Sequence, residues 1–107
     1  MKILLDECVT KHLKPYLPGH EVSTVAEQGW SGFQNGRLMT VAEAAGFDVL
    51  LTIDKNIKHQ QDSGRYSLIV AVLESPSSKL ETLIQYLPAF EQQLISYTKG
   101  NAYSISL

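Results

Sequence analysis

The sequence has one cysteine, few cationic residues and no long apolar run. Cys8 has no partner within the chain, which excludes an internal disulfide and fits a reducing compartment. Nine Lys and Arg against eleven Asp and Glu give a net charge of −2, so bulk charge alone would not hold nucleic acid. No apolar run approaches the about 20 residues that span a bilayer, and acids interrupt the N-terminal apolar stretch too early for a secretory signal. We therefore expect a cytoplasmic protein without a membrane segment.

The length and composition predict one folded domain over residues 1–107. Apolar residues make up 44% of the 107 and charged residues 19%, which is typical of a globular chain and not of a disordered one. The sequence has no internal repeat, low-complexity tract or block of like charge, so we find no linker between domains.

Short apolar runs alternate with segments of helical periodicity. The pattern predicts strands over residues 3–5, 20–25, 48–53, 67–73 and 102–107, and helices over residues 9–16, 38–45 and 80–87. A polar segment over residues 56–61 separates the third and fourth strands. Gly46 is expected to end the second helix, and Pro88 to kink or split the last one.

This alternation predicts the fold class. Strands that alternate with helices favour right-handed crossovers and a mostly parallel sheet with helices on both faces, an α/β/α sandwich of three layers. The last strand, which alternates apolar and polar residues, is expected at an edge of the sheet, either parallel or antiparallel to its neighbour. Such a sheet gathers its functional groups beyond the carboxyl ends of its strands.

Acidic side chains follow two of the predicted strands. Asp6 and Glu7 come directly after the first strand, and Asp54 comes directly after the third, so their carboxylates can meet at one edge of a parallel sheet. Asp48 precedes the third strand and is therefore expected at the opposite, amino-terminal ends of the strands. Asn35 stands where the connection from the second strand enters a helix, which is again near the carboxyl ends of the strands.

Two interpretations of these acids remain open. Clustered carboxylates repel one another unless a cation neutralises them, and hard oxygen ligands select Mg²⁺ or Mn²⁺, which supports metal-assisted hydrolysis of a phosphodiester. Alternatively, Asp6 and Asp54 cap the helices that follow them. We expect a metal site with Asp6 and Asp54 as ligands, Glu7 as a further catalytic acid, and Asn35 as both helix N-cap and neutral edge of the pocket.

Cationic and amide side chains in the segments that leave this edge are candidates for binding RNA. They are Lys11, Arg37, Lys55, Asn56, Gln60 and Gln61, with Lys14 and Lys58 in the same segments. The alternative is an ordinary set of scattered surface residues. Trp30 and Phe33 lie in a glycine-rich loop, where they either stack on a base or fold back onto the core.

Three segments carry a resemblance to a known family. Residues 1–7 (MKILLDE), 19–22 (GHEV) and 46–56 (GFDVLLTIDKN) resemble the small bacterial stand-alone PIN-like domain proteins, relatives of the VapC-type ribonuclease toxins. The likeness covers residues 1 to about 73, and its most specific piece is the strand that ends in Thr-x-Asp-Lys-Asn. The resemblance implies an α/β/α sandwich, an acidic pocket for Mg²⁺ or Mn²⁺, and cleavage of single-stranded RNA.

The resemblance also carries individual residues and partners. Asp6 matches the first-strand acid of the family, and Asp54 matches the acid after the Thr-x-Asp strand. Asn35 and Asn56 stand where the family usually has acids, and the mid-chain glutamate of full-length PIN domains has no clear counterpart. Such proteins are often encoded beside an antitoxin, which makes an antitoxin protein an implied partner. A homodimer is a further partner that the sequence leaves open.

Two other functions compete with a nuclease. A PIN-like scaffold that has lost acids would bind RNA or a protein without cleaving it, and Asn35 and Asn56 favour this alternative. A phosphoacceptor receiver domain also places acids after its first and third strands. That fold needs a hydroxyl residue after its fourth strand and a lysine after its fifth, whereas Glu74 follows the fourth strand here and no lysine follows the fifth.

Overall fold

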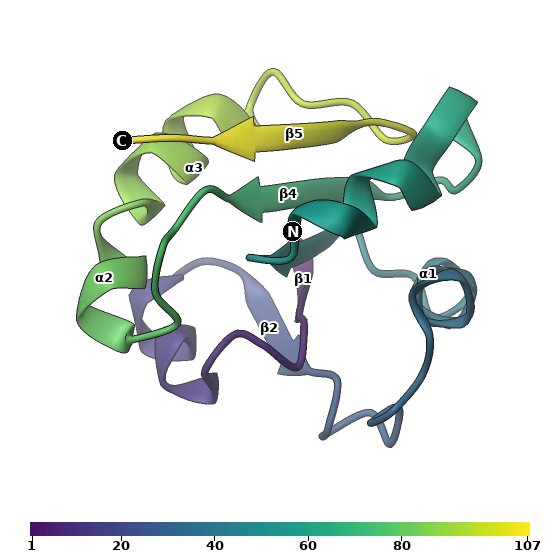
Figure 1. Cartoon of the computed structure of the whole chain (residues 1–107), viewed down its shortest axis with the longest axis horizontal. Helices are drawn as coiled ribbons and strands as arrows, with labels where there is room; N and C mark the ends of the chain where they lie inside the picture. Colours follow the sequence, from purple (N-terminus) through teal and green to yellow (C-terminus); the bar gives the residue numbers. More distant parts are fainter.

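The computed structural model describes residues 1–107, with the side chains of all of them except residues 62 and 63. Five parallel strands form one sheet in the order β2-β1-β3-β4-β5 (Figure 1). The strands are β1 (Lys2–Leu5), β2 (Glu21–Thr24), β3 (Val49–Thr52), β4 (Ile69–Leu73) and β5 (Ala102–Ile105). The helices are the 3₁₀ helix η1 (Lys11–Tyr16), α1 (Asn35–Ala44), the 3₁₀ helix η2 (Lys55–Gly64), α2 (Leu80–Ile84) and α3 (Leu87–Leu94).

The central strands are apolar along their whole length because helices cover both faces of the sheet. Alternate side chains of each strand point to opposite faces, so Ile3 and Leu5 pack with η1, α2 and α3, whereas Leu4 packs with α1 and η2. Figure 1 shows α2 and α3 on the side of the sheet away from α1. The predicted three-layer α/β/α sandwich is confirmed.

One crossover departs from the expected handedness. The connections β3–β4 and β4–β5 both move outward across the sheet in the same direction, yet η2 covers one face and the pair α2 and α3 covers the other. Two such connections have opposite hands, so the prediction of right-handed crossovers throughout is wrong. The residues of α2 and α3 pack in one core cluster with Ile69, Ala71 and Leu73, and this burial holds the connection on that face.

The ends of the helices follow the local sequence signals. Gly46 adopts φ +82 directly after α1, where its amide bonds the Glu43 carbonyl at 3.1 Å and the Phe47 amide bonds the Ala42 carbonyl at 3.1 Å. This pair of bonds satisfies the last carbonyls of the helix, as expected for a glycine stop. Pro88 lies in the first turn of α3, so the last predicted helix is split there and its second half continues to Leu94.

The last strand is at an edge of the sheet, as expected, and it runs parallel to β4. The polar segment between the third and fourth strands, where the alternation of strands and helices predicts a helix, forms the 3₁₀ helix η2. No helix among the described residues is long and apolar enough to cross a bilayer.

We predict that Gly46→Ala destabilises the fold by roughly 1–2 kcal/mol, because an L side chain at this positive φ is strained. Gly36→Ala is the matched control. Gly36 lies inside α1 and an added Cβ would meet the Gln60 Oε1 atom at 3.5 Å, an ordinary contact, so this change should be neutral or stabilising by up to about 1 kcal/mol. Urea unfolding of both variants measures the difference, and equal effects would contradict the prediction.

Candidate functional site

The strand order places the candidate site at one junction of the sheet. Strand β1 lies between β2 and β3. The connection from β1 to β2 runs one way across the sheet, and the connection from β2 to β3 runs back past β1, so the direction reverses at the junction of β1 and β3. In open α/β sheets, ligands bind beyond the carboxyl ends of the strands at this switch point. Asp6 follows β1 and Asp54 follows β3, which places both acids there. Asp48 lies at the opposite edge, as expected, where its carboxylate accepts bonds from the Lys2 amide and Lys99 Nζ.

Asp6 is nearly buried, with 9% of its surface exposed. Its Oδ1 accepts a hydrogen bond from the Glu7 amide at 2.8 Å, and its Oδ2 accepts one from the Thr52 hydroxyl at 2.8 Å. The Cys8 Sγ lies 3.7 Å from the same Oδ2 and 3.4 Å from the Thr52 hydroxyl. Burial raises the pKa of the Cys8 thiol, so at neutral pH it is a packed thiol and not a thiolate nucleophile.

Thr52 links the two predicted metal ligands. Its fully buried hydroxyl donates to Asp6 Oδ2 and accepts from the Asp54 amide at 3.0 Å. A single oxygen atom therefore joins the carboxylate after β1 to the backbone after β3. The Thr-x-Asp motif marks Thr52 in the sequence, but only the structure shows this bridge.

Asp54 also caps the helix that follows it. Its Oδ1 accepts from the Asn56 amide at 3.0 Å, and its carbonyl accepts from the Ile57 amide at 3.3 Å, at the start of η2. The capping interpretation is thus correct for one oxygen of this carboxylate. Its Oδ2 makes no hydrogen bond to any group among the described residues.

Glu7 and Lys11 border a pocket of about 260 Å³ beside Asp6, at the carboxyl ends of β1 and β2. The Glu7 carboxylate is exposed and accepts a hydrogen bond from the Gly32 amide at 2.7 Å, which ties down the glycine-rich loop. Trp30 in that loop packs edge-on against Phe47, with ring centroids 6.0 Å apart, so it folds back onto the core. Lys11 is exposed and forms no ion pair with a described side chain.

Asn35 does not cap its helix. The N-cap of α1 is Gln34, which makes no side-chain capping bond, and Asn35 is the first helical residue. The predicted cap is wrong because the helix begins one residue earlier than the capping interpretation requires. The second predicted role of Asn35, as a neutral edge of the metal pocket, stays a prediction.

The amide residues predicted to bind RNA divide into two groups. Gln61 is buried, its Oε1 accepts from the Tyr66 amide at 2.9 Å, and its Nε2 donates to the Leu68 carbonyl. Both ends of this amide therefore hold η2 against the start of β4, so the prediction that Gln61 binds RNA is wrong. Asn56 is exposed and Gln60 is half-buried, so both remain candidates.

The predicted cations are partly engaged within the protein. The Arg37 guanidinium stacks over the Phe33 ring, 3.8 Å from its centroid. Lys55 Nζ lies 3.2 Å from Glu74 Oε2, and Lys58 Nζ lies 3.0 Å from Glu74 Oε1. The Lys58 ammonium, the Ser104 hydroxyl and the Lys55 ammonium, in that order, lower the pKa of the Glu74 carboxyl from 4.5 to about 2.

Glu74 also lies at the carboxyl ends of the strands, although it is not among the site residues predicted from the sequence. It follows β4 directly, as Asp6 follows β1, and β4 is the neighbour of β3. The carboxyl ends of parallel strands meet at the same end of a sheet, so all three acids lie there. The signal in the sequence is the position of Glu74 directly after the strongest predicted strand.

Asp6 and Asp54 are carboxylates of the type that Mg²⁺ or Mn²⁺ takes, but within the part of the chain that the structure describes they do not belong to an enclosed cluster of metal-ligating side chains. No group of three or more His, Cys, Asp or Glu side chains with metal-binding geometry occurs among the described residues. Mg²⁺ is commonly held by one or two carboxylates, with water and substrate phosphate completing its shell. Asp6 and Asp54 supply two such carboxylates, and one oxygen of Asp54 is free among the described contacts.

Comparison of the chain with protein-family models, with curated proteins and with solved structures finds no match.

We predict that Thr52→Val destabilises the protein by about 1–3 kcal/mol, because Val keeps the shape of the side chain but leaves buried polar groups of Asp6 and Asp54 without their partner. Thr52→Ser, which keeps the hydroxyl, should restore most of the loss. Thr40→Val removes an exposed hydroxyl that bonds the Gly36 carbonyl and serves as the control. Chemical denaturation compares the three, and a Thr52→Val variant as stable as Thr40→Val would contradict the bridging role.

We predict that the stabilisation by Glu74 is lost in acid. Its pKa is lower in the folded protein, so its contribution is fully present above about pH 4.5 and declines as the pH falls toward 2. The difference in unfolding free energy between the wild type and Glu74→Gln should therefore be constant near neutral pH and shrink below pH 4.5. Denaturation at a series of pH values measures it, and a difference that grows in acid would contradict the assignment.

Proposed function

We propose that this chain is a metal-dependent ribonuclease that cleaves single-stranded RNA, a PIN-like protein related to the VapC-type toxins. The observation that carries the proposal is the arrangement of Asp6 and Asp54, which the Thr52 hydroxyl joins at the switch point of a parallel sheet. The resemblance of residues 46–56 to the PIN-like Thr-x-Asp strand supports it independently. An antitoxin protein and a second copy of the chain are the proposed protein partners, and the cytosol is the proposed location.

Asp6 and Asp54 would hold Mg²⁺ or Mn²⁺. When bound, the metal ion would lower the pKa of a water molecule and neutralise charge on the scissile phosphate. The Thr52 hydroxyl orients the Asp6 carboxylate by its hydrogen bond to Oδ2, and the hydrogen bond from the Glu7 amide fixes Oδ1. Lys11, which borders the pocket beside Asp6, supplies positive charge for the RNA backbone.

A specific observation favours a second function. The described side chains provide two acids at the switch point and no third ligand, and the lysines nearest to Asp54 are paired with Glu74. A PIN-like module that binds RNA or a protein without cleaving it needs no complete set of metal ligands. The two functions differ in their response to metal, because only the nuclease requires Mn²⁺ for turnover.

We predict that Asp54→Asn lowers the affinity for Mn²⁺ by about tenfold or more, the scale of loss when a group that supports a metal site is removed. Calorimetric titration of Mn²⁺ into both proteins measures it, and cleavage of a generic single-stranded RNA with and without Mn²⁺ tests the function. Asp48→Asn makes the same chemical change at the opposite edge of the sheet and should leave Mn²⁺ affinity unchanged. Equal affinities of the wild type and Asp54→Asn would remove Asp54 from the site.

A further inference from the structure

The ion pairs of Glu74 bring two ammonium groups to one place. Lys55 and Lys58 are three residues apart on the 3₁₀ helix η2, and in a helix with three residues per turn such side chains lie directly above one another. Each of them contacts a different oxygen of the same carboxylate, at 3.2 and 3.0 Å. The arrangement matches two cations that share one bridging anion.

The carboxylate is held on the rigid part of this arrangement. The Glu74 amide donates to the Ile105 carbonyl at 2.8 Å, and the Glu74 carbonyl accepts from the Tyr86 hydroxyl at 2.8 Å, so sheet and helix both fix its backbone. The lysines are the more accessible partners, since 68% of the Lys55 side chain and 35% of the Lys58 side chain are exposed, against 20% of Glu74. Both ammonium groups can therefore be reached from solution, and the Glu74 carboxylate, whose pKa they help lower to about 2, is the anion that a competing phosphate must displace.

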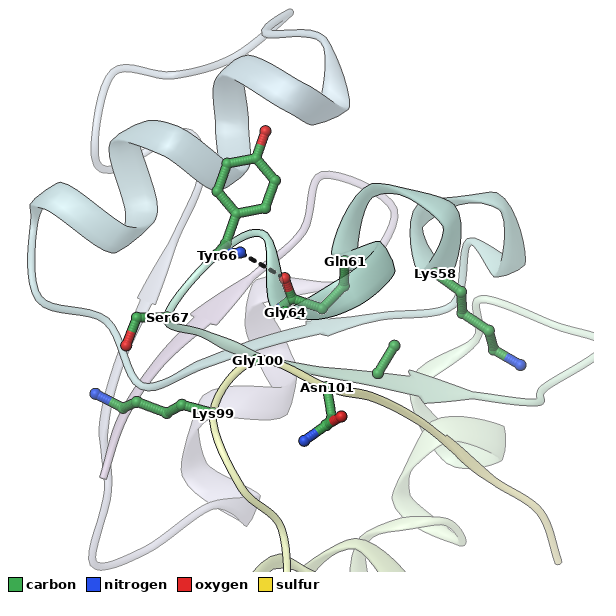
Figure 2. Close-up of a pocket in the computed structure, with 9 residues that line it drawn as sticks. Lys58, Gln61, Gly64, Tyr66, Ser67, Lys99, Gly100 and Asn101 are labelled. Carbon is green, nitrogen blue, oxygen red and sulfur yellow. Dashed lines mark hydrogen bonds between the residues drawn. The ribbon is translucent and has the colours of Figure 1, made fainter.

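Lys58 also lines a polar hollow of about 600 Å³ between η2 and the start of β5. Figure 2 shows Lys58 and Lys99 at opposite ends of its lining, with Gln61, Gly100 and Asn101 between them. Both lysines are paired with acids, Lys58 with Glu74 and Lys99 with Asp48. The volume is within the about 300–1,000 Å³ typical of ligand pockets.

We propose that Lys55 and Lys58 form a binding site for a backbone phosphate of single-stranded RNA, and that the Glu74 carboxylate occupies this site in the free protein. The inference rests on the proposed function, because it takes RNA as the ligand. Glu74 is then an internal competitor, since a phosphate occupies this site only when it displaces the carboxylate. The next nucleotides enter the polar hollow that begins at Lys58.

The test is the affinity for a labelled single-stranded RNA, measured by fluorescence anisotropy in EDTA so that no cleavage occurs. Glu74→Gln should bind several-fold more tightly than the wild type at low salt. RNA binding by Glu74→Gln should also depend more strongly on salt than binding by the wild type. The slope of log K against log salt concentration should steepen by roughly 0.7 for each additional phosphate contact. Adding Lys55→Gln and Lys58→Gln to Glu74→Gln should abolish the gain.

Glu81→Gln is the matched control, because it makes the same change in net charge at an exposed acid on α2 that has no ion pair among the described residues. If Glu81→Gln raises the affinity as much as Glu74→Gln, only net charge matters and the inference is wrong. If Glu74→Gln does not fold, the RNA affinities of the single variants Lys58→Gln and Lys79→Gln are compared instead. The change at Lys58 should then weaken binding more, and equal losses would overturn the site.

Cleavage of the same RNA with Mn²⁺ separates this inference from the proposed nuclease. A gain in binding by Glu74→Gln without any Mn²⁺-dependent cleavage supports the phosphate site and contradicts the nuclease. Mn²⁺-dependent cleavage with no difference between Glu74→Gln and Glu81→Gln supports the nuclease and overturns the phosphate site. Failure of every variant to bind the RNA overturns the phosphate site as well.

Discussion

Burial of the parallel sheet on both faces is the constraint on which the rest of the structure depends. Leu4 and Leu5 point to opposite faces and both are fully buried, so the interior of the sheet has no room for charged groups. In the central strands β1, β3 and β4, polar side chains are therefore confined to the strand ends. At the carboxyl ends, three neighbouring strands are each followed by an acid, namely Asp6, Asp54 and Glu74.

The three acids have different surroundings, and these suggest different roles. Asp6 is nearly buried and receives two short hydrogen bonds, which fix the orientation of its carboxylate. Asp54 uses one oxygen to begin η2 and has the other available among the described contacts. Glu74 is neutralised by Lys55 and Lys58 and so adds no free negative charge to the edge. The proposed metal site therefore uses the first two acids, whereas the third is occupied by two lysines of η2.

Much of the fold could be predicted from the sequence, because hydrophobic periodicity reports directly on burial. The apolar runs of β1, β3 and β4 predicted strands covered on both faces, and Gly46 and Pro88 predicted helix ends that the structure confirms. The face on which α2 and α3 pack could not be predicted, because it depends on which apolar side chains of distant strands remain uncovered. The hand of the last crossover follows from that packing and not from any local signal.

The candidate site could be located from the sequence but not described in detail. Asp6 and Asp54 lie at one junction of the sheet, as predicted, because their placement at the carboxyl ends of neighbouring strands depends only on topology. Side-chain hydrogen bonds depend on distances of a few tenths of an ångström, which is why the bridge made by Thr52 and the structural role of Gln61 were not foreseen. Asn35 was misassigned as a cap because a shift of one residue in a helix start reverses that role.

The most direct test of a metal site at the junction of β1 and β3 is paramagnetic broadening by Mn²⁺ in amide NMR spectra. Substoichiometric Mn²⁺ should first broaden the amide signals of Glu7, Asp54 and Asn56, which lie at the two carboxylates. The signals of Asp48 and Gly100, at the opposite ends of the strands, should persist. Broadening that begins at Asp48, or that spreads evenly over the chain, would contradict the account.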